Sequence, residues 1–324
     1  MTLLLRHATL LIFVAVLLWF GLQAPGFLSP ESLANIVKQA AFIGIAAIGI
    51  TFVLLTAGID LSVGSVMYLA PLIAGCAMRD LGISVAGGLV TAVLAGALLG
   101  AINAAAIVGL RIIPFIVTLA TLFAYRGFGA FLTGSQQFDF DRAMLDFGQA
   151  SLGPVPLPIV FFVALALLAH VVLTRTTFGR QVYALGNDPE AARKAGLPVD
   201  WIRARVYVIS DACAGLAGFI VIAQIGRLDA GFGEGREFDV IAAAEEARTA
   251  EDGGAGSALG ALVGATLIQT VKSGLAFTGV NLYLQPILMA AIIFLAVLVD
   301  SLRARALRLQ KRRTIRPLET RQVH

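Results

Sequence analysis

The chain has 324 residues, of which 58% are hydrophobic and 14% are charged, whereas a soluble globular domain carries about 25% charged residues. Its mean hydropathy is +0.88. These values exclude a disordered chain, a collagen-like repeat and an ordinary cytosolic enzyme. The net charge is +4, and the basic residues gather in two segments. We therefore expect a polytopic membrane protein whose spans each need about 20 apolar residues.

Apolar segments of helix length recur along the whole chain. They lie at about residues 8–24, 39–57, 63–78, 84–109, 113–133, 156–174, 205–226, 257–277 and 284–300. Each is predicted to be a helix, because isolated strands cannot satisfy their backbone groups in lipid. The first segment follows Arg6 and His7 as a signal peptide would, but Leu22, Ala24 and Pro25 make a poor cleavage site. We therefore predict a retained first span.

Glycines spaced by four residues occur within two of these segments. Gly96 and Gly100 form one such set, and Gly256, Gly260 and Gly264 form another. Small residues at this spacing let two membrane helices approach closely. They therefore predict helix packing and say nothing about chemistry.

No part of the sequence predicts a catalytic or metal centre. It contains no Gly-x-x-x-x-Gly-Lys-Ser/Thr phosphate loop, so it is not expected to bind ATP. Cys76 and Cys213 lie far apart in apolar runs, without metal-ligand spacing. We therefore predict no cofactor, no metal and no enzymatic activity, and any energy that the protein uses must come from a partner chain.

The basic residues predict which segments face the cytoplasm. Residues 175–205 contain six basic side chains and residues 301–324 contain eight, so the positive-inside rule places both segments in the cytoplasm. Residues 227–252 contain eight acidic and three basic side chains, which predicts an outside or water-lined segment. Asp139, Asp141 and Asp146 form a further acidic stretch. We divide the chain into a membrane domain, 1–300, and a basic cytoplasmic tail, 301–324.

This sidedness requires a crossing that hydropathy does not reveal. An even number of crossings must separate Arg205 from Arg303, but only three apolar spans lie between them. Residues 238–252 are the one unassigned stretch, and five charges lie between Glu245 and Asp252. On insertion scales each such charge costs about 2.5–3.5 kcal/mol at a helix centre. The stretch therefore either lines water inside the protein or is poorly inserted.

Two motifs predict an interrupted helix and its neighbour. Residues 55–65 place two glycines, an acid and two hydroxyl groups inside an apolar region, as expected for a broken helix end within a bundle. Residues 113–121 carry a proline suited to a helix's first turn. The candidate residues for a translocation path are Gly58, Asp60, Ser62, Gly64, Pro114 and Thr118.

Residues 178–196 predict a short exposed helix in the basic cytoplasmic loop. Asp188 can cap a helix that begins at Pro189, and Gly196 can end it. Glu190 and the small residues Ala191 and Ala192 would give this helix a surface that fits a partner's groove.

These three motifs, in this order and spacing, resemble the permease subunits of bacterial ABC importers for monosaccharides, the ribose, xylose, arabinose and galactoside group. The resemblance spans roughly residues 27–300. It implies an all-α fold of about ten transmembrane helices in the inner membrane, with a broken-helix region and a cytoplasmic coupling helix.

The resemblance also implies partners. They are a separate ATP-hydrolysing subunit, a second permease subunit that is either a copy or a paralogue, and a periplasmic sugar-binding protein, with membrane lipid around the chain and no nucleic acid. Glu190, Ala191, Ala192 and Gly196 correspond to the loop that engages the ATPase.

The chain departs from this family between residues 244 and 251. Members usually continue into an apolar stretch that contains Gly-Gly-Thr, whereas here the sequence is Ala-Glu-Glu-Ala-Arg-Thr-Ala-Glu. The stretch is either a local alteration that damages the permease or a diverged, water-lined segment. Two alternative functions stay open: an ion-coupled secondary carrier that uses Asp60 and Asp211, and an inactive membrane paralogue.

Overall fold

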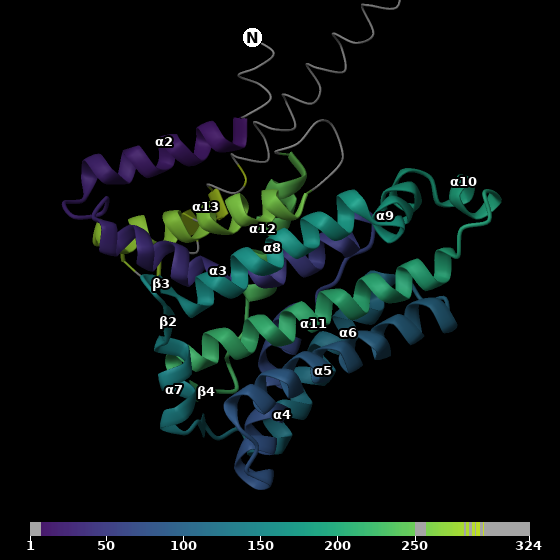
Figure 1. Cartoon of the computed structure of the whole chain (residues 1–324), viewed down its shortest axis with the longest axis horizontal. Helices are drawn as coiled ribbons and strands as arrows, with labels where there is room; N and C mark the ends of the chain where they lie inside the picture. Colours follow the sequence, from purple (N-terminus) through teal and green to yellow (C-terminus); the bar gives the residue numbers. More distant parts are fainter. Residues whose placement is uncertain are drawn as a thin grey trace, which may run out of the picture.

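The structure, a computed structural model, describes residues 8–249, 257–281, 283–284, 287–288, 290–291 and 294. The predicted span at 284–300 and the tail at 301–324 lie largely or wholly outside these residues. Long helices make up most of the fold (Figure 1). The helices are α2 (Ala8–Gln23), α3 (Pro30–Leu55), α4 (Val63–Leu81), α5 (Val85–Ala104) with the π-helical turn η1 (Ala105–Gly109), α6 (Pro114–Thr133), α7 (Arg142–Gln149), α8 (Leu157–Arg175), α9 (Thr177–Asn187), α10 (Pro189–Lys194), α11 (Val199–Ile225), α12 (Arg236–Thr249) and α13 (Ala258–Phe277).

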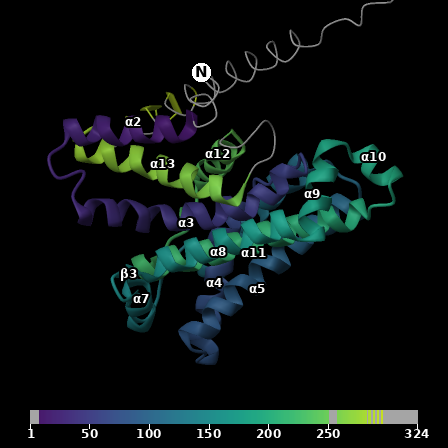
Figure 2. The same ribbon diagram turned by 45° about the horizontal axis from the view of Figure 1, so that its top comes forward.

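Four two-residue strands connect the helices at one end of the bundle. Strand β1 (Phe138–Asp139) pairs antiparallel with β4 (Arg227–Leu228), and β2 (Ser151–Leu152) pairs antiparallel with β3 (Val155–Pro156). Helix α7 lies beside them, whereas α9 and α10 lie at the opposite end of the bundle (Figures 1 and 2). Asp139, Asp141 and Asp146 are exposed at the α7 end, as the sequence predicts for a segment in water.

The predicted apolar segments are helical wherever the structure describes them. Among the described residues, six helices are long and apolar enough to cross a membrane: α3, α5 continued by η1, α6, α8, α11 and α13. Several large apolar side chains on them point away from the protein, including Phe123, Phe131 and Leu168. Such faces suit a hydrocarbon surround and not water. The chain is therefore a multi-pass membrane protein.

Helix α11 is the centre of the bundle and packs against α5, α3 and α4. Gly96 and Gly100 on α5 lie directly against the backbone carbonyls of Asp211 and Tyr207 on α11, so that a Cβ at either glycine would collide with them. This contact confirms that the glycine pair serves close helix packing. Gly264 makes the same kind of contact with Ala243, between α13 and α12.

Residues 229–249 form the stretch where the parity argument predicts a further crossing. Helix α11 ends just before β4, at the α7 end, and α12 lies between it and α13 in the chain. Asp239 of α12 pairs with Lys272 of α13, and Ala243 packs on Gly264, so the two helices run antiparallel. With 14 residues, α12 is about 21 Å long, and the turns at 229–235 lead into it from β4. The predicted crossing therefore combines the turns at 229–235 with the 14 residues of α12.

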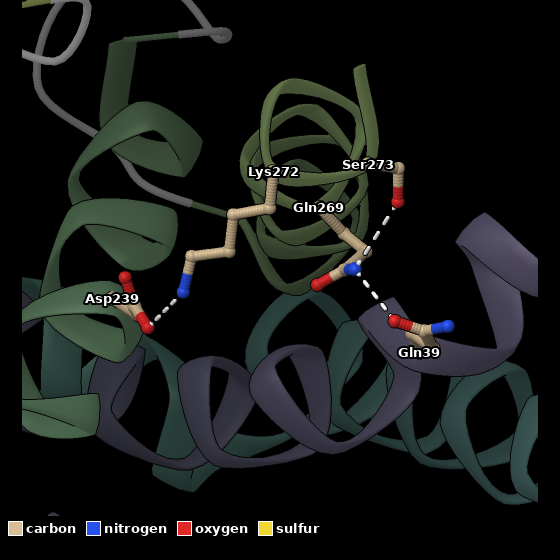
Figure 3. Close-up of polar contacts among 5 residues, drawn as sticks. All are labelled: Gln39, Asp239, Gln269, Lys272 and Ser273. Carbon is tan, nitrogen blue, oxygen red and sulfur yellow. Dashed lines mark hydrogen bonds and ion pairs between the residues drawn. The ribbon is translucent and has the colours of Figure 1, made fainter. Parts of the chain in front are cut away.

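Polar contacts hold α12 and α13 in place (Figure 3). The Lys272 ammonium group is paired with the Asp239 carboxylate, and both side chains are largely buried. Gln269 Nε2 donates to Gln39 Oε1 on α3 at 2.9 Å and to Ser273 Oγ at 3.3 Å. Asp239 thus has a cationic partner inside the protein, which lowers the cost of placing its charge there.

Candidate functional site

The predicted interruption between α3 and α4 lies at residues 56–62. Ala57 has a left-handed backbone with φ +56°, a conformation that is uncommon outside glycine. The N–H groups of Ala57 and Gly58 donate back to Leu54 O and Val53 O at 3.0 and 3.1 Å. The end of α3 therefore satisfies its backbone locally, as a break inside a membrane bundle requires.

Asp60 is the centre of a buried hydrogen-bond network. Asp60 Oδ1 accepts from Ser62 N at 3.0 Å and from Ser62 Oγ at 2.6 Å, and Oδ2 accepts from Ser210 Oγ at 3.0 Å. Asn103 Nδ2 donates to Ser62 Oγ at 2.9 Å and to Asp211 Oδ2 at 3.0 Å. All five side chains are fully buried. The network ties the break to α5 and α11.

The carboxyl groups of Asp60 and Asp211 accept hydrogen bonds from neutral groups. The donors are a backbone N–H, two hydroxyls and an amide. Ionisable side chains inside a membrane protein are costly and mark functional positions. A buried network in which nearly every group has a partner also fixes one arrangement of the helices that it joins. The network therefore restrains the interrupted helix relative to α5 and α11.

The first turn of α6 lies beside the break. Pro114 is the first residue of α6, as predicted, and Thr118 follows one turn later. Thr118 Oγ1 donates to Pro114 O at 3.0 Å and lies 3.4 Å from Ile59 O. Tyr207 Oη also donates to Ile59 O, at 3.3 Å. Five of the six candidate path residues therefore lie at or beside the break that precedes α4. They are Gly58, Asp60, Ser62, Pro114 and Thr118.

The sixth candidate, Gly64, faces a different part of the protein. It packs against the backbone of Gly233 and the carboxylate of Glu237, on the side of α4 that meets the segment before α12. The sequence reasoning missed Asn103 and Ser210. Asn103 could have been found, since it is a polar residue inside an otherwise apolar run.

The short helix predicted in the basic loop is α10. Asp188 Oδ1 accepts from the backbone N–H groups of Glu190 and Ala191 at 2.9 and 3.0 Å. Gly196 ends the turn with φ +80°, and its N–H donates to Arg193 O at 3.0 Å. These contacts confirm the predicted cap and stop. Glu190 and Ala191 are exposed, but Ala192 is 5% exposed and packs inward, so its side chain is not on the outer face.

Helix α9 connects α10 to the end of α3. Gly186 of α9 lies directly against the carbonyl of Leu55, the last residue of α3. The rings of Phe178 and Phe52 are stacked, with centroids 6.4 Å apart. A displacement of α10 would therefore reach the interrupted helix through one intervening helix.

Long apolar helices around a buried, interrupted helix define a membrane transport protein. A solved structure described as a metal-chelate-type ABC transporter in an inward-facing conformation has the same fold, with a TM-score of 0.50, 15% identity and coverage of 91% of this chain and 99% of that chain. The profile of the family described as branched-chain amino acid transport system / permease component matches residues 32–297. The chain belongs to this family of permease components.

Several relatives are named for sugars. The ribose import permease protein RbsC of Escherichia coli K12 is 33% identical over 90% of this chain and 91% of its own. The D-allose transport system permease protein AlsC of the same strain is 32% identical over 92% of both chains. The galactose/methyl galactoside import permease protein MglC is 30% identical over 92% of this chain and 93% of its own.

Proposed function

We propose that the chain is the membrane-spanning permease subunit of an ABC importer and forms the path for a monosaccharide. The observation that carries the proposal is the set of sugar-named relatives, which match about nine tenths of the chain at 30–33% identity. A periplasmic binding protein delivers the sugar, and a separate subunit hydrolyses ATP. The chain sits in the bacterial inner membrane with about ten transmembrane helices, and it pairs with a second permease subunit, either a copy or a paralogue.

The proposed path runs past the interrupted helix. Gly58, Asp60 and Ser62 form its inner part, beside Pro114 and Thr118 at the start of α6. Gly64 continues it along α4. Support comes from the fully buried polar groups of Asp60, Ser62 and Thr118, which lie where the helix between α3 and α4 is interrupted.

The proposed coupling element is α10. Its exposed residues Glu190 and Ala191 contact the ATPase, whereas Ala192 packs inward and Gly196 ends the helix, so that these two residues hold its backbone in place. ATPase closure pushes α10, α9 transmits the displacement to Leu55, and the break at 56–62 absorbs it. The contact of Gly186 with Leu55 supports this route. The sugar-named relatives favour an ABC permease over an ion-coupled carrier built on Asp60 and Asp211, and over an inactive paralogue.

Co-purification tests the proposal. We expect the tagged chain, expressed with its candidate ATPase and solubilised in mild detergent, to retain that ATPase in a defined complex. Glu190→Lys reverses an exposed charge without touching the core and should weaken the complex by about tenfold, equivalent to about 1.4 kcal/mol. Asp146→Lys, an exposed reversal at the α7 end, is the matched control. Equal retention by both variants and the wild type would argue against docking at α10.

Cysteine labelling tests the sidedness. In a chain with Cys76 and Cys213 replaced by alanine, a cysteine at Arg193 should react from the cytoplasmic face only, and one at Asp141 from the periplasmic face only. Arg312 lies outside the described residues, and a cysteine there should react from the same face as one at Arg193. If the cysteines at positions 193 and 312 react from opposite faces of the membrane, the predicted topology is contradicted.

A further inference from the structure

The turns between β4 and α12, residues 229–235, cover the start of α4 and the middle of α6. The buried backbone of Gly233 packs directly on the carbonyl of Gly64. Glu234 Oε1 lies 3.2 Å from Arg126 Nη1 on α6. We name residues 229–235 the covering segment. It fastens to α4 by backbone contact and to α6 by this ion pair.

Three buried polar side chains beneath the covering segment keep groups without partners. They are the Tyr68 hydroxyl, Nε and Nη2 of Arg126, and Oε2 of Glu237, none of which has a hydrogen-bond partner within the described part of the chain. Tyr68 is 1% exposed and Glu237 is 6% exposed. Unpaired buried polar groups are rare in native proteins, because each loses its hydration without replacement. Three from three helices in one place require an explanation.

The three side chains converge. Glu237 Oε2 lies against Gly64, and Tyr68 follows Gly64 by one turn on the same face of α4. The Tyr68 ring packs on Gly129, one turn after Arg126 in α6. Elements that are far apart in sequence thus bring a donor, an acceptor and a hydroxyl to one location.

The nearby Thr133 hydroxyl explains only part of the arrangement. Thr133 Oγ1 donates to its own helix, at 3.2 Å from Gly129 O and 3.3 Å from Ala130 O, so toward Tyr68 it can act only as an acceptor. Arg126 likewise uses one nitrogen on Glu234 and leaves two. Two nitrogens of Arg126 and one oxygen of Glu237 therefore keep their hydrogen-bonding capacity unused among the described residues.

We propose that Tyr68, Arg126 and Glu237 form a station that binds the hydroxyl groups of the sugar in transit beneath the covering segment. The inference rests on the proposed function and deepens it. A sugar hydroxyl both donates and accepts hydrogen bonds, and the station offers a guanidinium donor, a carboxylate acceptor and a phenol that does both.

Transport in proteoliposomes tests the station. The wild-type complex, with its ATPase and binding protein, is first assayed with radiolabelled D-ribose, D-allose and D-galactose, and the fastest sugar is used with its deoxy analogues. Tyr68→Phe and Glu237→Gln, which keep the side-chain shape, should each lower uptake per integrated complex by about tenfold. Binding-protein-stimulated ATP hydrolysis should stay within about twofold of wild type. Tyr283→Phe, at an exposed tyrosine, is the matched control and should change neither rate.

The preference for the sugar over its deoxy analogue separates a binding role from a structural one. It should fall in at least one station variant, because a missing hydroxyl no longer leaves a protein group unpaired. If the wild type takes up a sugar and both variants take it up at the same rate, the station is overturned but the proposed function is not. Reduced uptake with proportionally reduced ATP hydrolysis and an unchanged preference would also overturn it. Absence of wild-type uptake for every sugar would instead overturn the proposed function.

Discussion

Gly196→Pro is expected to separate ATP hydrolysis from sugar uptake. Proline cannot adopt the φ of +80° that Gly196 has, and it lacks the N–H that donates to Arg193 O. The end of α10 must therefore move, while no membrane-spanning helix is touched. We expect uptake per integrated complex to fall by at least about tenfold, because the displaced end of α10 no longer transmits ATPase closure. ATP hydrolysis by the complex should continue.

A second glycine provides the control for this substitution. Gly82 ends α4 with φ +66°, and its N–H donates to Met78 O at 3.1 Å. Gly82→Pro therefore causes the same backbone change outside the α9 and α10 region and should leave uptake and ATP hydrolysis coupled. Uptake and hydrolysis are measured together in proteoliposomes, with membrane-integrated yield as the reference. Full transport by Gly196→Pro would remove α10 from the coupling route.

Replacing residues 245–251 by an apolar, glycine-containing segment is expected to raise the membrane-integrated yield severalfold. The segment begins within α12, in the stretch where the parity argument predicts a crossing. Each charge at a helix centre costs about 2.5–3.5 kcal/mol. The charges from Glu245 to Asp252 would together cost on the order of 10 kcal/mol against lipid. If the stretch is a local alteration, the replacement should also restore transport.

Asp239→Asn is the matched control, because it also removes one acidic charge from α12. Asp239 has a cationic partner, however, and its removal leaves Lys272 charged and largely buried. The yield should therefore fall, opposite to the result for residues 245–251. Yield is measured by quantitative blotting of carbonate-washed membranes, and uptake by vesicles made from them. Loss of a transport activity that the unaltered chain already has would show that the acids of residues 245–251 line a working water-filled path.

Features that depend on neighbouring residues could be predicted from the sequence. The cap and stop of α10 follow from Asp188, Pro189 and Gly196, because a side-chain cap and a left-handed glycine act within one turn. The break after Leu55 followed from polar residues inside an apolar run. The contact of Gly96 and Gly100 with another helix followed from their spacing, although the partner helix did not.

Features that depend on distant residues could not be predicted. Asp60 meets Ser210 across 150 positions, and Asn103 meets Asp211 across 108. Nothing local to either residue identifies the other. The crossing at 229–249 was required by parity, but hydropathy could not reveal it, because its first part is a loop and α12 has only 14 residues. The inward position of Ala192 likewise comes from its packing, not from its neighbours in sequence.

Energised uptake of a sugar tests the central claim most directly. The chain is reconstituted in proteoliposomes with its ATPase, and radiolabelled D-ribose, D-allose and D-galactose are presented with the binding protein. We predict that at least one sugar accumulates, and that accumulation requires the chain, ATP and the binding protein together. Accumulation driven by a proton or sodium gradient in the absence of ATP and of the binding protein would contradict the assignment as an ABC permease.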